Sequence, residues 1–369
     1  RASTSVRADS NVRRLPDGVT ATAPDGSQAR SDVISTYSVG ASLDVPISRQ
    51  RLLLSYDLTQ SKYATFSNLD FNGEDGRAIL HWEAGRLATG QAGVTRARTQ
   101  ANLADTLGRA PNLRTSTRKF IDAGYPFHAN WQLNGGISST ESANSDALNR
   151  VSDSTTDSVN LELRYVGGAA NFLGVRAAYS EASFPNPTVI GGVPIDNGYK
   201  QQSYALVAGY TTGGASSLQL SIGQSERRPN ESFRGTSTGF TGSLTFNWNP
   251  TGATSLNLAA TREFSPAENV TTSGSVSDAL QLGVGWKPTA TLTVQGNMGY
   301  QRRDYTLALL AGLPVPRRDE TRTMGLSVSY AAHARLTLSI SAQHEQREST
   351  LPGSDYTADI VSATAQLNF

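Results

Sequence analysis

Apolar and polar residues alternate along this chain, and that period of two limits the possible folds more than any other feature. Near the C-terminus, Val361, Ala363, Ala365, Leu367 and Phe369 are apolar, and the residues between them are polar. Successive side chains of a β-strand point to opposite faces, so such a segment has one apolar and one polar face. The pattern recurs in segments of about ten residues, which is typical of a transmembrane β-barrel with lipid outside and water inside. A terminal aromatic residue after such an alternation is also the usual ending of an outer-membrane barrel.

Several segments show the alternation clearly. Their apolar positions follow every second residue, whereas a helix would need spacings of three and four. These positions are Val159, Leu161, Leu163 and Tyr165; Leu218, Leu220 and Ile222; Phe240, Leu244, Phe246 and Trp248; Leu292, Val294 and Met298; and Leu336, Leu338 and Ile340. The fold class is therefore predicted to be all-β. The stretch 262–280 fits least well, because Arg262 and Asp278 interrupt its apolar face.

Connections of two lengths separate the segments. Gly, Pro and Asn mark short turns near residues 46–48, 85–90, 125–128, 167–170, 212–214, 249–252, 287–290 and 331–333. Longer polar loops lie roughly at 15–31, 64–75, 105–112, 141–154, 184–198, 228–236, 264–272, 306–318 and 348–354. These connections predict about 18 antiparallel strands, within a range of about 16–20, with short periplasmic turns and longer extracellular loops.

Composition is consistent with one barrel domain over residues 1–369. Hydrophobic residues make up only 37% of the chain, and no run approaches the roughly 18 apolar residues of a membrane helix. The first strand is expected to begin near Ala2, and Arg1 indicates a mature or trimmed chain. A propeller is the alternative for a repeat of about 40 residues, but its blades would need much shorter strands.

Aromatic residues support a membrane-spanning barrel. Eight of them lie beside the predicted short turns on the apolar face, which predicts an aromatic girdle at the periplasmic interface. The alternative is that aromatic residues are simply common in strands. The eight are Tyr125, Trp131, Tyr165, Phe172, Tyr210, Trp248, Trp286 and Tyr330.

The polar face of each strand is predicted to line the lumen, and many arginines occupy it. Cross-strand pairing with acids would explain each arginine singly, but arginine is expected to exceed acid there. The planar guanidinium suits carboxylate and phosphate, so the predicted lumen favours an anionic solute. The residues predicted to line the substrate path are Arg7, Arg13, Arg77, Arg96, Arg98, Arg118, Arg164, Arg176, Arg303 and Arg335. The inward placement of Arg96 and Arg98 requires the weakly apolar Gly93, Thr95 and Ala97 to face lipid.

A barrel of this size encloses a water-filled channel, which some segment must narrow. No loop is long enough for an obvious constriction loop. The candidates for a lid are Arg30, the proline-containing loop 184–198 and the apolar loop 306–318.

Catalysis and metal binding are not expected. The chain has no cysteine, which excludes disulfides, thiolate metal sites and a cysteine nucleophile. It has four histidines. His81 and Glu83 share one strand face, yet no serine motif accompanies them. The net charge of +1 gives no indication of a nucleic-acid partner. We expect no enzyme activity and no cofactor.

The chain resembles the EpsL-type outer-membrane barrels of exosortase-associated exopolysaccharide clusters. The resemblance is carried by Ser10-Asn11-Val12-Arg13-Arg14-Leu15 and by residues 63–73 running into Gly76-Arg77-Ala78, although Ser10 stands where the family has an acid. The layout is also similar to that of the alginate-export barrel, whose lumen is rich in arginine. The resemblance implies a single-chain pore that secretes an exopolysaccharide.

The leading functional prediction is a bacterial outer-membrane pore that passes an anionic exopolysaccharide from periplasm to exterior. Its expected partners are the polysaccharide, outer-membrane lipid and periplasmic or inner-membrane polysaccharide-synthesis or co-polymerase proteins. One alternative is a diffusion porin for small anions or sugars. Another is an adhesin or structural barrel that transports nothing.

Overall fold

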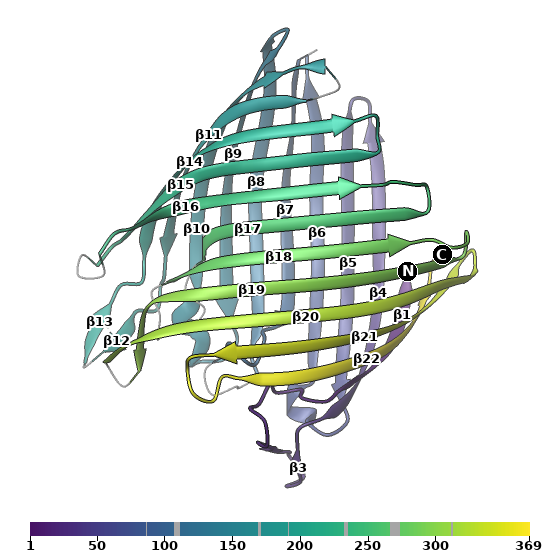
Figure 1. Cartoon of the computed structure of the whole chain (residues 1–369), viewed down its shortest axis with the longest axis vertical. Helices are drawn as coiled ribbons and strands as arrows, with labels where there is room; N and C mark the ends of the chain where they lie inside the picture. Colours follow the sequence, from purple (N-terminus) through teal and green to yellow (C-terminus); the bar gives the residue numbers. More distant parts are fainter. Residues whose placement is uncertain are drawn as a thin grey trace.

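One closed antiparallel sheet of 18 strands forms a barrel (Figure 1). The structure is a computed structural model. It describes residues 1–85, 87–106, 111–168, 171–190, 192–231, 235–265, 274–310 and 313–369, without the side chains of 190, 265, 274, 306–310 and 313–316. β1 pairs with both β4 and β22, so the sheet has no free edge. Closure satisfies the backbone hydrogen-bonding groups that hydrocarbon cannot.

The barrel strands run in chain order around the wall. They are β1 (Ala2–Asp9), β4 (Asp32–Ile47), β5 (Gln50–Tyr63), β6 (Phe71–Ala84), β7 (Ala88–Gln100), β8 (Leu113–His128), β9 (Trp131–Asn144), β10 (Ser154–Val166), β11 (Phe172–Ser183), β14 (Tyr199–Thr212), β15 (Ser216–Pro229), β16 (Ser237–Trp248), β17 (Thr254–Ser265), β18 (Gly274–Trp286), β19 (Leu292–Leu310), β20 (Leu313–His333), β21 (Leu336–Ser349) and β22 (Tyr356–Leu367).

Small elements lie in the longer connections. They are the hairpins β2 (Ala21–Thr22) with β3 (Gln28–Ala29) and β12 (Thr188–Ile190) with β13 (Val193–Ile195), and the 3₁₀ turns η1 (Ser67–Leu69) and η3 (Asn149–Ser152). Among the described residues no helix is long and apolar enough to cross a membrane.

The predicted fold class, strand number and alternation of turns and loops are confirmed. Both termini lie at the end of the barrel that carries the short turns, which is the periplasmic end (Figure 1). The predicted loop at 306–318 is wrong, because β19 and β20 continue into it as paired backbone up to Leu310 and Leu313. Pairing between the two strands satisfies backbone hydrogen-bonding groups in this segment. The apolar residues alone did not indicate that the strands continue.

The strand registers sort side chains into two faces. Residues directly opposite one another share a face, and rows such as Leu206–Ile222 and Val328–Ile340 are apolar and exposed. These rows form the lipid-facing belt. Phe172 is not part of it: it lies on the inner face, two residues from Gly174 and four from Arg176, beneath the Arg164 guanidinium at 4.1 Å. Its predicted place in the periplasmic girdle is therefore wrong.

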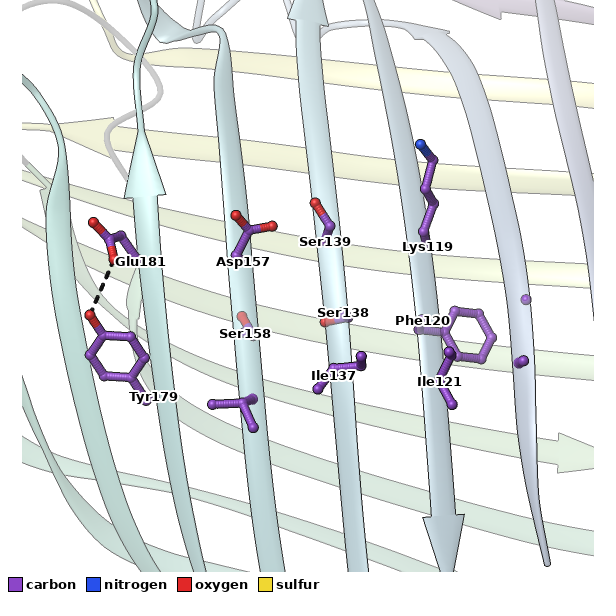
Figure 2. A pocket seen from close by; sticks show the side chains of 13 residues that line it. Lys119, Phe120, Ile121, Ile137, Ser138, Ser139, Asp157, Ser158, Tyr179 and Glu181 are labelled. Carbon is purple, nitrogen blue, oxygen red and sulfur yellow. Dashed lines mark hydrogen bonds between the residues drawn. The ribbon is translucent and has the colours of Figure 1, made fainter.

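A band of charged residues borders the belt at its extracellular side. Figure 2 shows the boundary, with Lys119, Ser139, Asp157 and Glu181 in a row above Ile121 and Ile137. Arg262 and Asp278 belong to this band and form an ion pair of 2.8 Å on the outer face. The interruption of the alternation at 262–280 thus marks the membrane boundary; residues 266–273 lie outside the described part of the chain.

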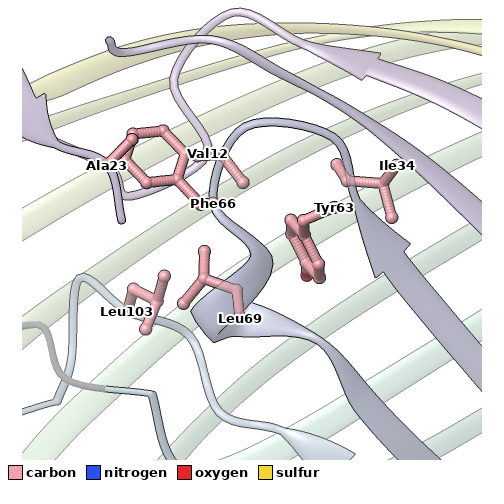
Figure 3. Packing of buried hydrophobic residues seen from close by; sticks show 7 residues of the cluster. All are labelled: Val12, Ala23, Ile34, Tyr63, Phe66, Leu69 and Leu103. Carbon is pink, nitrogen blue, oxygen red and sulfur yellow. The ribbon is translucent and has the colours of Figure 1, made fainter. Parts of the chain in front are cut away.

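Three connections share a small hydrophobic core at the extracellular mouth (Figure 3). Val12 comes from the β1–β4 connection, Phe66 and Leu69 from the β5–β6 connection, and Leu103 from the β7–β8 connection. Phe66 and Leu69 are 0% and 1% exposed. The β1–β4 connection lies over the inner wall, where its Arg14 forms ion pairs with the inward Asp9 and Glu345.

A substitution on either face of one strand tests the assignment of faces. Leu220→Arg places a charge in the lipid belt and should lower the free energy of unfolding by about 2–4 kcal/mol. Ser221→Arg, one residue along on the inner face, should leave it nearly unchanged. Urea unfolding in lipid vesicles measures both, and equal losses would contradict the assignment.

Candidate functional site: the barrel lumen

Hydroxyl groups form cross-strand pairs along the inner wall. Oγ of Ser341 lies 2.8 Å from Oγ of Ser362, and Oγ of Ser329 lies 3.0 Å from Oγ of Ser339. On the β14–β16 wall, Ser203, Ser225 and Thr241 form a chain with spacings of 2.8 and 2.9 Å. The pairs keep the wall polar without fixed charge, so it offers weak hydrogen bonds at many levels.

Six of the predicted lumen arginines are on the inner face of the strands. The registers place Arg7, Arg77, Arg118, Arg164, Arg176 and Arg303 there. Arg77 donates from Nε to Oγ of Ser55 at 2.9 Å, and the Arg118 guanidinium lies 5.4 Å from the ring centre of Phe120. Within the part of the chain that the structure describes, no carboxylate is in direct contact with either guanidinium.

The predicted inward placement of Arg96 and Arg98 is wrong. Arg96 pairs across the sheet with Gly76 and Arg98 with Glu74, in the row of Tyr56 and Val94 on the outer face. Arg96 Nε donates to Glu74 at 2.7 Å, and the Tyr56 hydroxyl donates to the same carboxylate. The two arginines therefore extend the outer charged band. The sequence did not indicate this, because the small residues on the inner face of β7 give too weak a pattern to decide which face is polar.

The prediction that Arg13 and Arg335 are inward-facing strand residues is also wrong, because both lie in connections. Arg13 lies in the β1–β4 connection, with its guanidinium 4.8 Å from the Phe66 ring centre, and burial lowers its pKa. It thus belongs to the mouth. Arg335 lies in the exposed turn between β20 and β21 at the periplasmic end, because β20 continues to His333.

Arginine does not exceed acid on the strands that the structure describes. The inward arginines are Arg7, Arg51, Arg77, Arg114, Arg118, Arg164, Arg176, Arg227, Arg303, Arg317 and Arg347. The inward acids are as many: Asp9, Asp32, Asp44, Asp57, Asp75, Glu83, Asp122, Glu162, Glu263, Asp319 and Glu345. Any preference for anions must therefore come from local clusters.

One cluster lies in a polar recess on the inner wall of β7–β11, which is lined by Arg164, Arg176, Glu162 and Asp122. The buried Glu162 binds both Arg164 and Arg176, with 2.5 Å to Nη2 of Arg176. The recess has a volume of about 580 Å³ and also contains Gln132 and Asn134. Within the described residues, Nδ2 of Asn134 is buried without a hydrogen-bond partner. The recess therefore offers guanidinium groups and the Nδ2 donor of Asn134 to a sugar, while Glu162 and Asp122 balance the two arginine charges.

A second cluster lies at the extracellular mouth. Arg317 and Arg347 both bind Asp319, and Arg317 lies over the Tyr305 ring at 4.3 Å. Arg347 also binds Asp105, a residue of the β7–β8 connection, at 2.7 Å. This cross-lumen contact could not be found from sequence, because nothing in residues 101–106 indicates a partner near 347.

Two of the predicted lid candidates, Arg30 and the loop 184–198, lie in different places. Arg30 lies in the mouth segment, where Nη2 donates to Asp17 at 2.8 Å and to backbone oxygens of Leu15 and Thr357. The loop 184–198 carries the β12–β13 hairpin, which lies beyond the strand ends with Val189 and Val193 exposed (Figure 1). Among the described residues no group of three or more His, Asp or Glu side chains could hold a metal ion.

Comparisons with known proteins agree with this geometry. Residues 196–369 match the family described as "Putative beta-barrel porin 2". A search of curated proteins gives no match. The fold superposes on the FrpB iron transporter of Neisseria meningitidis (F5-1 variant) with a TM-score of 0.52 and 10% identity, covering 94% of this chain and 61% of that one.

A second solved barrel matches over nearly its whole length. OccK2 of Pseudomonas aeruginosa, in complex with glucuronate, gives a TM-score of 0.50 and 14% identity, covering 100% of this chain and 98% of that one. The protein is a bacterial outer-membrane β-barrel. Its fold and the match over residues 196–369 make this barrel porin-like.

Replacing one arginine on each face of the wall tests whether the inward charges set the ion selectivity of the lumen. Arg118→Gln should lower the anion-to-cation permeability ratio about twofold, because a unit charge about 8 Å away in water contributes roughly 0.5 kcal/mol. Arg96→Gln, on the outer face, should leave the ratio unchanged. Reversal potentials in a salt gradient measure both, and an effect confined to Arg96→Gln would contradict the register.

Proposed function

We propose that the barrel is an outer-membrane pore through which an acidic exopolysaccharide passes from the periplasm to the exterior. The observation that carries the proposal is the polar inner wall, which contains both hydroxyl pairs and arginines bound to hydroxyl oxygens. Two examples are the Nε donors of Arg77 and Arg114. Arg77 donates to Oγ of Ser55 at 2.9 Å, and Arg114 donates to Oγ of Ser142 at 2.7 Å. Such a wall offers hydrogen bonds to sugar hydroxyls and positive charge to carboxylates.

Passage of a polymer needs contacts that are numerous and individually weak. Conduction requires binding strong enough for entry and weak enough for release. Hydroxyl pairs meet this condition, since each replaces hydrogen bonds to water with similar ones. The recess with Arg164 and Arg176 would receive the carboxylates of the chain nearer the periplasmic end.

The mouth also favours a conduit that is closed at rest. Three connections share a buried core there, and Asp105 extends from one of them to Arg347 on β21, with five strands between β7 and β21 around the wall. A permanently open diffusion pore would have no need of such a cover. The resemblance to EpsL-type barrels supports export, and the polymer would then be delivered by periplasmic or inner-membrane synthesis proteins.

A diffusion porin for small anions or sugars is the second candidate. The description of the matching family is that of a porin, and OccK2 was solved with glucuronate, a carboxylated sugar. In this case the Arg164–Arg176 recess would bind a single sugar acid.

Conductance in planar bilayers separates these functions. If the barrel exports an acidic polymer, an oligomer of glucuronic acid added at the periplasmic side should block the current for long, length-dependent periods. A neutral glucose oligomer of equal length is the control and should block only briefly. Steady conductance blocked equally by the monomer would instead support the diffusion porin. The absence of even brief openings at any membrane voltage would support a structural barrel.

A further inference from the structure

We propose that Leu53, Ile79 and Phe120 form an apolar platform on the inner wall, on which the pyranose rings of the polymer stack as they pass. The ligand is a sugar chain, recognised by the C–H face of each ring. This inference rests on the proposed function and names a contact for the sugar ring itself, as distinct from its carboxylate.

The platform is an apolar row on a wall that is otherwise polar. Leu53 on β5 lies opposite Ile79 on β6. Gly93 on β7 lies between Ile79 and Phe120 of β8 in the same row, on the inner face. The side chains of Leu53, Ile79 and Phe120 are all partly exposed. The row therefore presents apolar surface to the lumen across four neighbouring strands.

Gly93 joins these side chains into one surface, because it has no side chain of its own. A Cβ atom at Gly93 would lie 3.0 Å from Cζ of Phe120 and 3.2 Å from Cγ1 of Ile79. The Phe120 ring therefore lies against β7, and Figure 2 shows it extending from β8 toward that strand. A ring already held against the wall loses little further side-chain entropy when a ligand stacks on it.

The Phe120 ring differs from other inward rings in its distance to arginine. The guanidinium carbons of Arg164, Arg227 and Arg317 lie 4.1, 4.1 and 4.3 Å from the ring centres of Phe172, Tyr199 and Tyr305. Arg118 lies 5.4 Å from the centre of the Phe120 ring, which is beyond the roughly 3.5–4 Å of atoms in contact. Within the described residues, no guanidinium is therefore stacked closely on this ring.

The groups around the platform fit the edge of a sugar ring. A pyranose ring has C–H groups on its faces and hydroxyl groups at its edge, so it can stack on an aromatic ring while it forms hydrogen bonds. The inner row nearer the mouth contains Arg77, Thr95 and Arg118, and the inner row nearer the periplasm contains Gln91, Asp122 and Asn160. A sugar on the platform would thus have cationic donors on one side and amides with a carboxylate on the other.

The platform is continuous with the polar recess. Asp122 and Asn160 also line the recess that contains Arg164 and Arg176, and Phe120 is two residues from Asp122 along β8, toward the mouth. A chain whose carboxylate lies in the recess would therefore place its next rings over the platform on its way outward.

The test compares two acidic polymers in planar bilayers, on wild-type protein and on Phe120→Ser. One is an oligomer of glucuronic acid, and the other is an oligomer of glutamic acid with as many carboxylates but no sugar ring. Loss of the phenyl ring should raise the blocking concentration of the glucuronic acid oligomer about fivefold, because less apolar surface is buried. The blocking concentration of the glutamic acid oligomer should not change.

Four further variants separate the ring from charge and from folding. Phe120→Tyr keeps the ring and should behave as wild type. Ile79→Thr should reproduce the selective effect of Phe120→Ser at smaller size, and it replaces that variant where Phe120→Ser yields no folded barrel on heat-shift gels. Arg118→Gln should raise the blocking concentrations of both oligomers, whereas Ser138→Ala, opposite Phe120 on the inner face, should change neither.

Two outcomes count against the inference in different ways. If the glucuronic acid oligomer blocks the wild type for long periods, and Phe120→Ser changes the response to both oligomers equally or to neither, the platform is overturned and the proposed function stands. If the glucuronic acid oligomer gives no length-dependent block of the wild type, the proposed function and the platform are overturned together.

Discussion

The structure depends on one constraint, the hydrogen bonding of the backbone in hydrocarbon. Each unpaired N–H or C=O in lipid costs several kcal/mol, and the pairing of β1 with both β4 and β22 removes the edges at which such groups would remain. Closure fixes the parity of every strand, because a slip by one residue would exchange the faces. The lipid belt and polar lumen follow from this single condition.

Closure leaves the mouth as the place where the chain can specialise. Strand residues are committed to lipid or lumen, whereas the connections at the extracellular end are free to pack on one another. Phe66, Leu69, Val12 and Leu103 form there a small core of the kind found in water-soluble proteins. This small core stabilises the connections independently of the hydrogen bonds of the sheet, and local stabilities in one protein can differ widely.

Much of the fold could be predicted from sequence because the period of two is local. The strands with strong apolar parity, such as 218–222, gave their faces correctly. Prediction failed on β7, where Gly93, Thr95 and Ala97 alternate with Val94, Arg96 and Arg98, and neither set is clearly apolar. Only pairing with Gly76 and Ala78 on β6 decides that register. Asp105 and Arg347 could not be joined by any local rule, because their contact depends on the course of a loop across the lumen.

The outward placement of Arg96 and Arg98 leaves the lumen with balanced charge rather than with an excess of arginine. A lumen uniformly rich in arginine would bind a polyanion along its whole length and hold it. In this barrel the inward arginines and acids are equal in number on the described strands. Two arginines share Glu162 in the recess, and two share Asp319 at the mouth. Hydroxyl pairs such as Ser329–Ser339 and Ser341–Ser362 add uncharged polar groups to the same wall. The polymer that we propose as cargo would then exchange one weakly held carboxylate for the next, because an acid such as Glu162 already competes for the arginines.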